Sequence, residues 1–134
     1  MFRIAAAAHS FIYRRGMGRK MGQMPLVLLT TTGRKSGRPH TVPLGCVREG
    51  DGWVLIASYG GADVHPSWWL NLLANPNATI EDSGKRVNVR MQEITNPSDY
   101  ERLWNRVVSQ MKGYANYPKK TSRAIPLGLL RPVS

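Results

Sequence analysis

Apolar and polar residues alternate along much of this chain, and the pattern predicts short antiparallel strands. Apolar, β-branched runs cover residues 25–32, 41–48 and 53–58. Residues 49–52 read Glu-Gly-Asp-Gly, which is turn chemistry suited to a hairpin. We therefore expect three successive antiparallel strands, the first two of them joined by a loop over residues 33–39.

A second strand pair is expected further along the chain. Residues 78–82 and 86–94 flank a Ser-Gly-Lys turn. Within the second segment Val87, Val89 and Met91 alternate with polar residues, as in a strand with one buried face. This pair should belong to the same sheet as the first three strands.

Helical periodicity appears in three segments, and a closing strand follows them. Residues 2–21 form a candidate N-terminal helix, and residues 68–73 form a short one after Pro66 and Ser67. Asn96-Pro97 supplies a cap and a first-turn proline for a third helix, whose apolar residues recur at helical spacing from Tyr100 to Met111. Residues 125–131 can add a closing strand.

These elements indicate one domain of mostly β structure. A chain of 134 residues is long enough for one hydrophobic core and too short for two independent ones. Many short antiparallel strands favour a barrel, because closure of a sheet removes its exposed edges. We expect an N-terminal helical arm over residues 1–22 and a barrel domain over residues 23–134.

The charge distribution narrows the choice of partner. The chain has 19 basic and 8 acidic residues, for a net charge of +11, and no acid occurs before Glu49. Such a basic field favours an anionic partner, whether nucleic acid, acidic lipid or a small molecule with phosphate and carboxylate groups. Charge alone does not choose among them, and a solvated basic face without a partner also stays open.

The chain has few residues of the types that bind metals or act as catalytic groups. The single cysteine, Cys46, and the three histidines have no zinc-ligand spacing, so we expect a reducing and metal-free environment. The apolar run near the N-terminus is shorter than a spanning helix and lacks a cleavage site, which favours a cytoplasmic protein. No serine, histidine and acid combination suggests a hydrolase. An enzyme of this composition would rely on a cofactor for its reaction.

Two longer motifs carry a resemblance to a known family. Residues 28–37 read Leu-Leu-Thr-Thr-Thr-Gly-Arg-Lys-Ser-Gly, and residues 65–72 read His-Pro-Ser-Trp-Trp-Leu-Asn-Leu, with Ala-Asn-Pro following at 74–76. Together they resemble the deazaflavin-dependent nitroreductase family. The resemblance implies a mostly β (α+β) split β-barrel of the flavin-mononucleotide-binding type, with an N-terminal helix and two packing helices. It also implies coenzyme F420, a deazaflavin with a phosphate and a tail of glutamates.

The same resemblance implies a set of site residues. Arg34, Lys35 and Ser36 would hold the phosphate and the tail, in a loop rich in donors for such groups. The other expected cofactor-binding residues are His40, Thr41, Val42, Pro43, Leu44, Ile56, Ala57, Ser58, Tyr59, Ser67, Trp68, Trp69, Leu70, Asn71 and Tyr114. For the tryptophans, plain core packing is the alternative.

Candidates for acting on the acceptor are Tyr114, Tyr117 and Ser58. A neutral phenol, with a reference pKa of about 10, can donate a hydrogen bond to an acceptor oxygen as hydride arrives. Three positions depart from the family pattern: Gly45 where an aromatic is common, Tyr59 where lysine is common, and Met111 where some relatives carry tyrosine. The last of these leaves the choice of acceptor open.

The expected function is hydride transfer from reduced F420 to a small electron-poor acceptor, such as a quinone, an enone or a nitro compound. The alternatives are a barrel that binds flavin mononucleotide and a basic nucleic-acid-binding module, although the chain has no recognised nucleic-acid-binding signature and no such partner is expected. The N-terminal arm combines Phe2, Phe11 and Ile12 with Arg14 and Arg15, so it could lie on an anionic membrane beside a membrane quinone.

Overall fold

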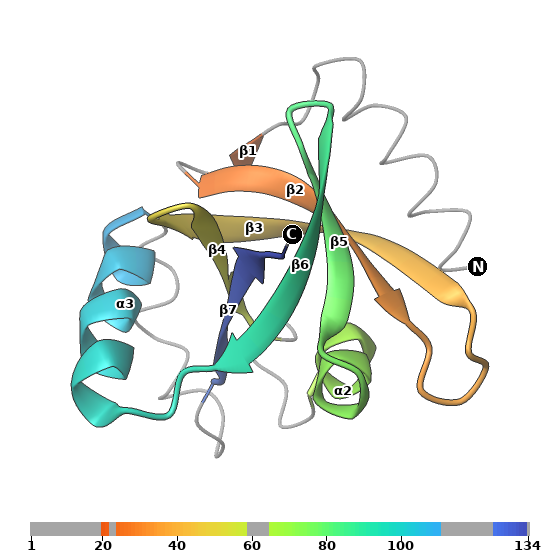
Figure 1. The fold of residues 1–134 in the computed structure, drawn as a ribbon. Coiled ribbons are helices and arrows are strands. Elements are labelled where there is room, and N and C mark those ends of the chain that lie inside the picture. The colour runs from red at the N-terminus through yellow and green to blue at the C-terminus, as the bar shows by residue number, and fades with distance from the viewer. Residues whose placement is uncertain (1–19, 22–23, 59–64, 111–124, 134) are drawn as a thin grey trace.

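The structure, a computed structural model, describes residues 20–21, 24–58, 65–110 and 125–133 (Figure 1). The described strands are β1 Lys20–Met21, β2 Met24–Thr32, β3 Pro39–Glu49, β4 Gly52–Ile56, β5 Asn77–Asp82, β6 Lys85–Glu93 and β7 Leu127–Pro132. The described helices are α2 Ser67–Ala74 and α3 Pro97–Gln110. Every strand and both later helices expected from the sequence are present.

Six of the strands close into an antiparallel barrel. Their order is β2-β3-β4-β7-β6-β5, and β2 pairs with β5 to complete the ring. Closure leaves few free strand edges, which agrees with the expectation from the sequence. β1 is a short addition that pairs Lys20 with Pro25 and Met21 with Met24. The helix expected over residues 2–21 therefore does not reach Lys20, and its remainder lies outside the described residues.

One edge of β3 is unpaired along the first half of the strand, which leaves the barrel open there. From Pro39 to Gly45, β3 pairs with β2, whereas its pairing with β4 covers only Cys46 to Glu49. The other edge of residues 39–45 has no strand partner in the described part of the chain. Glu49 pairs with Gly52 across a two-residue hairpin, so its backbone amide and carbonyl point toward β4. The backbone groups of every second residue back along β3 point to the same side. For Pro39 and Pro43 this is the open side. Proline has no amide hydrogen, so an unpaired edge is a favourable place for it.

Three strand boundaries differ from the sequence expectation by two residues, and the others agree to within one residue. β3 begins two residues earlier, at Pro39, because pairing with β2 continues to Thr32. β4 ends at Ile56 instead of residue 58, and β7 begins at Leu127 instead of residue 125. Ala57 still donates a backbone hydrogen bond of 2.9 Å to the carbonyl of Pro126. The end of β4 and the start of β7 thus lie side by side where the two segments leave the barrel.

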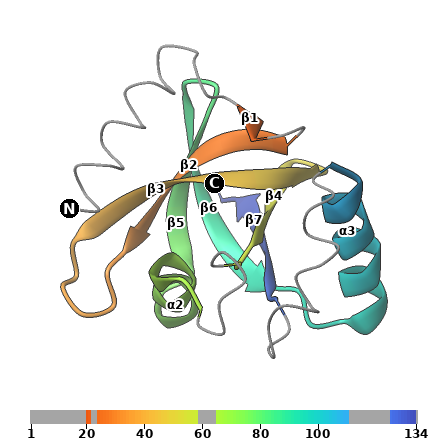
Figure 2. The same ribbon diagram turned by 180° about the vertical axis from the view of Figure 1, so that it is seen from behind.

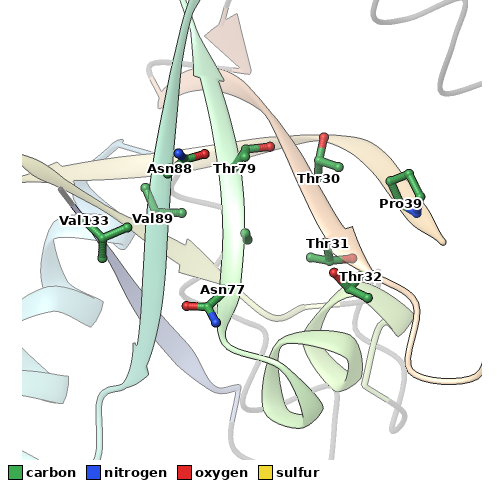
Figure 3. A pocket seen from close by; sticks show the side chains of 10 residues that line it. Thr30, Thr31, Thr32, Pro39, Asn77, Thr79, Asn88, Val89 and Val133 are labelled. Carbon is green, nitrogen blue, oxygen red and sulfur yellow. The ribbon is translucent and has the colours of Figure 1, made fainter. Parts of the chain in front are cut away.

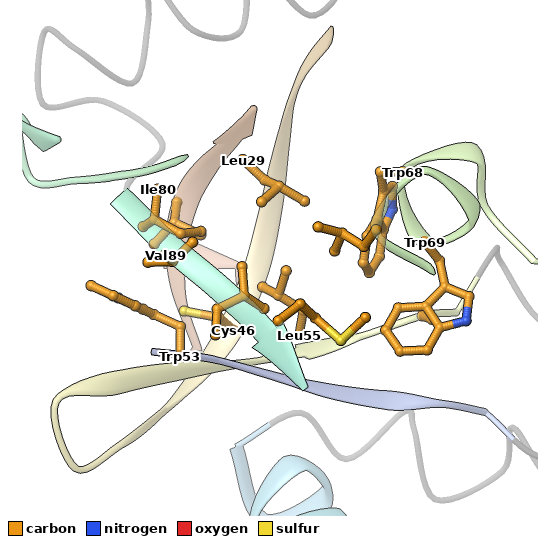
Figure 4. Close-up of a cluster of buried hydrophobic side chains, with 13 residues drawn as sticks. Leu29, Cys46, Trp53, Leu55, Trp68, Trp69, Ile80 and Val89 are labelled. Atoms are coloured by element: carbon orange, nitrogen blue, oxygen red, sulfur yellow. The ribbon is translucent and has the colours of Figure 1, made fainter. Parts of the chain in front are cut away.

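The core has two layers. Inside the barrel, Leu29, Cys46, Leu55, Ile80 and Leu130 are fully buried, together with side chains from α2 (Figure 4). Outside the barrel, α3 covers the outer faces of β4 and β7, and its apolar stripe is buried there (Figures 1 and 2). Members of this second layer are Val47, Val54, Ile56, Leu103, Val107, Ile125, Leu127 and Leu129. The predicted packing of α3 on the sheet is therefore confirmed.

The helices present no membrane span. In the described part of the chain, neither helix combines the length and the apolar character required to cross a bilayer.

Candidate functional site

The loop of residues 33–38, called the basic loop below, connects β2 to β3 and is closed by its own hydrogen bonds. The amide of Gly33 donates to the carbonyl of Arg38 at 2.8 Å, and the amide of Gly37 donates to the carbonyl of Gly33 at 2.9 Å. Gly37 has a φ of 70°, in the left-handed region that favours glycine. Ser36 Oγ accepts from the amide of Arg38 at 3.1 Å and lies 3.2 Å from Nε2 of His40.

Gly33 is required by close packing inside the basic loop. A Cβ atom at this position would lie 2.6 Å from both Nε2 of His40 and Oγ of Ser36. Two expected site residues, Ser36 and His40, are thus brought together by the fold, and Gly33 permits their approach. Their side chains hold the loop in shape, which is the structural contribution of both residues.

Asn71 of α2 connects the helix to the basic loop. Its Oδ1 accepts hydrogen bonds from the amide of Arg34 at 3.1 Å and from Nη1 of the same residue at 2.9 Å. Its Nδ2 donates to Oγ1 of Thr31 at 3.1 Å, and only 5% of the Asn71 side chain is exposed. Nη1 of Arg34 also reaches the carbonyl of Ser67 at 3.4 Å. The sequence named Arg34, Ser67 and Asn71 separately, and the fold joins them.

The outward side of the basic loop is rich in donors. The hydrogen bonds within and onto the loop use the amides of Gly33, Arg34, Gly37 and Arg38. The amides of Lys35 and Ser36 have no acceptor among the described residues. The side chains of Lys35 and Arg38 are exposed, and within the described ranges neither forms an ion pair. Consecutive free amides beside cationic side chains make a concavity suited to an anion.

The open side of β3 supplies an apolar surface next to the basic loop. Val42 and Leu44 are partly buried against the inner core, and Thr41 and Pro43 are half-buried. Oγ1 of Thr41 lies 2.7 Å from Oγ1 of Thr30 on β2. Ile56 and Ala57 are buried, and Ser58 is half-buried at the end of the same segment. Val42, Pro43 and Leu44 therefore offer an apolar edge with few competing polar groups, whereas the side chain of Ile56 packs in the layer under α3 and Ala57 belongs to the inner core.

The two tryptophans of α2 lie in the barrel core. Trp69 is 1% exposed, and a Cβ at Gly128 would approach its Cζ3 to 2.7 Å. Trp68 meets Trp69 edge to face at 6.1 Å between ring centroids, and Leu70 is half-buried (Figure 4). The observed role of Trp69 is packing, the alternative that the sequence left open. This packing fixes the position of Asn71, two residues later.

Several expected site residues cannot be placed. Tyr59, Tyr114 and Tyr117, together with Met111, lie outside the described residues. Their roles stay predictions.

Sequence reasoning missed three residues of the site, Thr31, Gly33 and Arg38. Thr31 anchors Asn71, Gly33 permits the loop closure, and Arg38 adds a third cation. The Nδ1 atom of His65, just before α2, is buried with no hydrogen-bond partner in the described structure. The motif Thr-Thr-Thr-Gly-Arg-Lys-Ser-Gly contained the signal for Thr31 and Gly33, whereas a buried unpartnered nitrogen can only be found in three dimensions.

A shallow hollow of about 420 Å³ lies beside the basic loop on the outer surface of the barrel (Figure 3). It is lined mainly by hydroxyl and amide side chains from β2, β5 and β6, which include Thr30, Thr32, Asn77, Thr79 and Asn88. A second hollow, of about 450 Å³, follows on β6 and β7.

The opposite end of β3 uses its charges differently. Glu49 accepts hydrogen bonds from Nη2 of Arg102 at 2.9 Å and from Nη1 of Arg106 at 2.6 Å, which ties the hairpin to α3. The hydrogen bond from Arg102 lowers the pKa of Glu49 from 4.5, assisted by the charges of both arginines and opposed by partial burial. Nearby, Asp82 accepts from Arg48 at 2.6 Å and from Nε1 of Trp53 at 3.0 Å.

Comparisons with known proteins agree on one family. Residues 3–132 match the family described as F420H(2)-dependent quinone reductase. The chain is 39% identical over 128 residues to an F420H(2)-dependent quinone reductase of Mycobacterium tuberculosis, covering 91% of this chain and 86% of the relative.

Solved structures give the same result. An F420-H2 dependent reductase is 38% identical, with a TM-score of 0.73 over 80% of this chain and 94% of the other. A protein solved as a domain-swapped dimer is 34% identical, with a TM-score of 0.75 over 93% and 95% of the two chains.

Proposed function

The chain belongs to the family of F420H(2)-dependent quinone reductases, and from that premise we propose that the basic loop, the open edge of β3 and α2 together bind coenzyme F420. The fold is the split β-barrel that the resemblance implied, and the protein is an oxidoreductase that uses F420. The proposal concerns which residues hold the coenzyme and what they do to the acceptor.

The chemistry of the donor set fits the anionic part of F420. The basic loop presents the free amides of Lys35 and Ser36 and the exposed side chains of Lys35 and Arg38. Hydrogen bonds from charged donors to phosphate are shorter and stronger than neutral ones. Because Arg34 is held by Asn71, its main contribution is to fix the loop, and Lys35 is the side chain best placed to contact the phosphate. The free amides beside Lys35 are the single observation that carries the proposal.

The apolar part of the site fits a flat heteroaromatic ring. Val42, Pro43 and Leu44 lie on the open half of the barrel, and the half-buried Ser58 follows the end of β4. When bound there, reduced F420 supplies the hydride that an electron-poor acceptor takes up. The protein residues position the ring and exclude water, and such positioning can account for much of a rate enhancement.

The proposed acceptor is a quinone, with enones and nitro compounds as further acceptors of the same electronic type. Ser58 and the phenols of Tyr114 and Tyr117 are the proposed donors to the acceptor oxygen. Each is neutral at pH 7, so each can donate a hydrogen bond without placing a charge in the site. Phenylalanine at either tyrosine position should lower kcat more than it weakens F420 binding.

Titration with oxidised F420, followed by its fluorescence, tests the cofactor site. Tight binding of F420, weaker binding of flavin mononucleotide and a loss of about tenfold or more in F420 affinity for Lys35→Ala would support it. The matched control is Lys85→Ala, which removes the same charge from the β5–β6 turn and should change nothing. No binding of F420 by the wild type, or equal losses in the two variants, would refute the assignment.

We also propose that residues 1–22 bring the protein to an anionic membrane where a lipid-soluble quinone resides. Support comes from sequence, since this segment carries five basic residues and no acidic ones alongside Phe2, Phe11 and Ile12. The expected result is pelleting of the full chain with anionic liposomes, and loss of pelleting after deletion of residues 1–22. Pelleting that survives the deletion would contradict the proposal.

A further inference from the structure

Two arginines face each other across β6 and β7 on the outer surface of the barrel. Arg90 pairs directly with Arg131 in the strand register, and both side chains are exposed. Their neighbours Met91 and Leu130 belong to the inner core, so Arg90 and Arg131 point outward. Like charges placed directly opposite in a sheet destabilise it.

Nothing in the described structure neutralises this pair. Arg90 donates from Nη1 to Oδ1 of Asn77 at 3.3 Å, which is a contact with a neutral amide. Across the ranges that the structure describes, neither arginine forms an ion pair, whereas Arg48, Arg102 and Arg106 are each bound to a carboxylate. The pair therefore keeps its positive charge available to a ligand.

The two arginines continue a polar row that begins at the basic loop. Thr32 pairs with Pro39 beside the loop. The β2–β5 ladder ends at the pair Thr30 and Thr79, and two residues further along their strands Thr32 and Asn77 line the same hollow. Asn77 pairs with Arg90, and Arg90 pairs with Arg131. These four residues, Thr32, Asn77, Arg90 and Arg131, are called the outer track. It crosses four adjacent strands, one residue from each.

The outer track is accompanied by two hollows. Thr32 and Asn77 line the first, and Arg90 and Arg131 line the second, while Val133 borders both. A parallel row of Thr30, Thr79 and Asn88 forms the wall of the first hollow, as their side chains in Figure 3 show. From Thr32 to Arg131 the track crosses three strand spacings, roughly 14 Å. About four extended peptide units span that distance.

We propose that the outer track binds the glutamate tail of F420, continuing from the phosphate held at the basic loop. This inference rests on the proposed cofactor site. A chain of carboxylates matches the track in charge and in its row of side-chain donors, and about four of its units would span the track. Guanidinium groups suit carboxylates because their donors are arranged as a planar fork.

A lipid surface is a poorer match for the same residues. Binding at a membrane interface needs a substantial apolar face beside the basic residues. In the described part of the chain, the only large apolar side chains that are well exposed are Leu73, at 50%, and Val133, at 45%. Of these, only Val133 borders the track.

The experiment compares F420 forms that differ only in tail length. Binding of a form with the phosphate but no glutamate, and of a long-tailed form, is followed by fluorescence with the wild type and the double variant Arg90→Gln/Arg131→Gln. We expect the wild type to prefer the long tail, and the double variant to lose roughly threefold to tenfold in affinity for that form alone. The loss should shrink as salt screens the charges.

Controls separate this inference from the cofactor assignment. Lys85→Gln removes one charge from the opposite end of β6 and should leave the tail preference intact. If the wild type binds no form of F420, the proposed function fails. If it binds both forms and the double variant keeps the wild-type preference, or loses affinity for both forms equally, the outer track proposal is wrong. Loss of binding to anionic lipid vesicles without loss of tail preference would also overturn it.

Discussion

The two ends of β3 use arginine in opposite ways. At the hairpin end, Arg102 and Arg106 bind Glu49, so their charges are neutralised and α3 is tied to the barrel. At the loop end, Arg34 is held by the neutral amide of Asn71, and Arg38 forms no ion pair among the described residues. One end uses its charges in ion pairs that hold the fold, whereas the cations at the other end have no ion-pair partner among the described residues.

The two ends of β3 are held to the rest of the fold by interactions of different strength. Exposed ion pairs contribute about 0.2–1 kcal/mol each, so the hairpin end stabilises the fold modestly. The loop end is held by buried neutral hydrogen bonds through Asn71, whose loss is more costly because donors and acceptors are left unsatisfied. Variants at the two ends should therefore move different observables.

The largest effect is expected for Asn71→Ala. The change leaves the Thr31 hydroxyl and the Arg34 amide without their partner, at a cost of roughly 1–3 kcal/mol in the free energy of unfolding. F420 affinity should fall as well, because the basic loop is no longer fixed to α2. Urea unfolding and fluorescence titration measure the two effects.

The control for this variant is Leu73→Ala on the same helix. Leu73 is half exposed, so the free energy of unfolding should change by no more than about 0.5 kcal/mol. An unchanged urea midpoint for Asn71→Ala would show that the loop does not depend on this residue.

The next effect is a pH-dependent loss of stability in Glu49→Gln. The pKa of Glu49 is lowered from 4.5 in the folded protein, so its ionised form contributes stability that is fully present above pH 4.5. At pH 7 the variant should be less stable by about 1 kcal/mol. The difference should disappear as the pH falls through the lowered pKa, because both side chains are then neutral. Urea unfolding at decreasing pH from pH 7 measures it, and a difference that does not shrink as the solution is acidified would contradict the prediction.

Smaller effects are expected for Arg38→Gln and Arg102→Gln, which each remove one charge, the first from the loop end and the second from the hairpin end. Each variant should change a different property. The first should weaken F420 binding roughly twofold to fivefold with no change in the urea midpoint. The second should lower the urea midpoint slightly, because an exposed ion pair stabilises the fold only weakly, and leave F420 binding unchanged. Similar effects of both variants on the same observable would end the distinction between the two ends.

The smallest effect is expected at Cys46, which lies in the core between the two ends. Burial, aided by the charge of Asp82, raises the pKa of its thiol to about 12, so the native protein should barely react with a thiol reagent at pH 8. Asn71→Ala should speed labelling by favouring opening of the barrel, whereas Lys35→Ala should not. Rapid labelling of the wild type would show that the barrel opens without help from either change.

Much of the fold could be read from the sequence. The strands, both later helices and the closed barrel follow from alternation, turn residues and two family motifs. The predicted strand ends were less accurate, since the start of β3 at Pro39 depends on how far β2 pairs with it. For the site, the motifs predicted Arg34, Lys35, Ser36 and Asn71 as members, which stays a prediction, and their local pattern gave no sign that Asn71 binds Arg34.

Short contiguous motifs and the imbalance of charge were enough to assign the family, the cofactor class and the position of the basic loop. Which arginines are neutralised and which remain available depends on how the chain folds. Glu49 meets Arg102 and Arg106, and Arg90 meets Arg131, across strands and helices distant in sequence. Electrostatic interaction depends on distance in space, and barrel closure sets those distances.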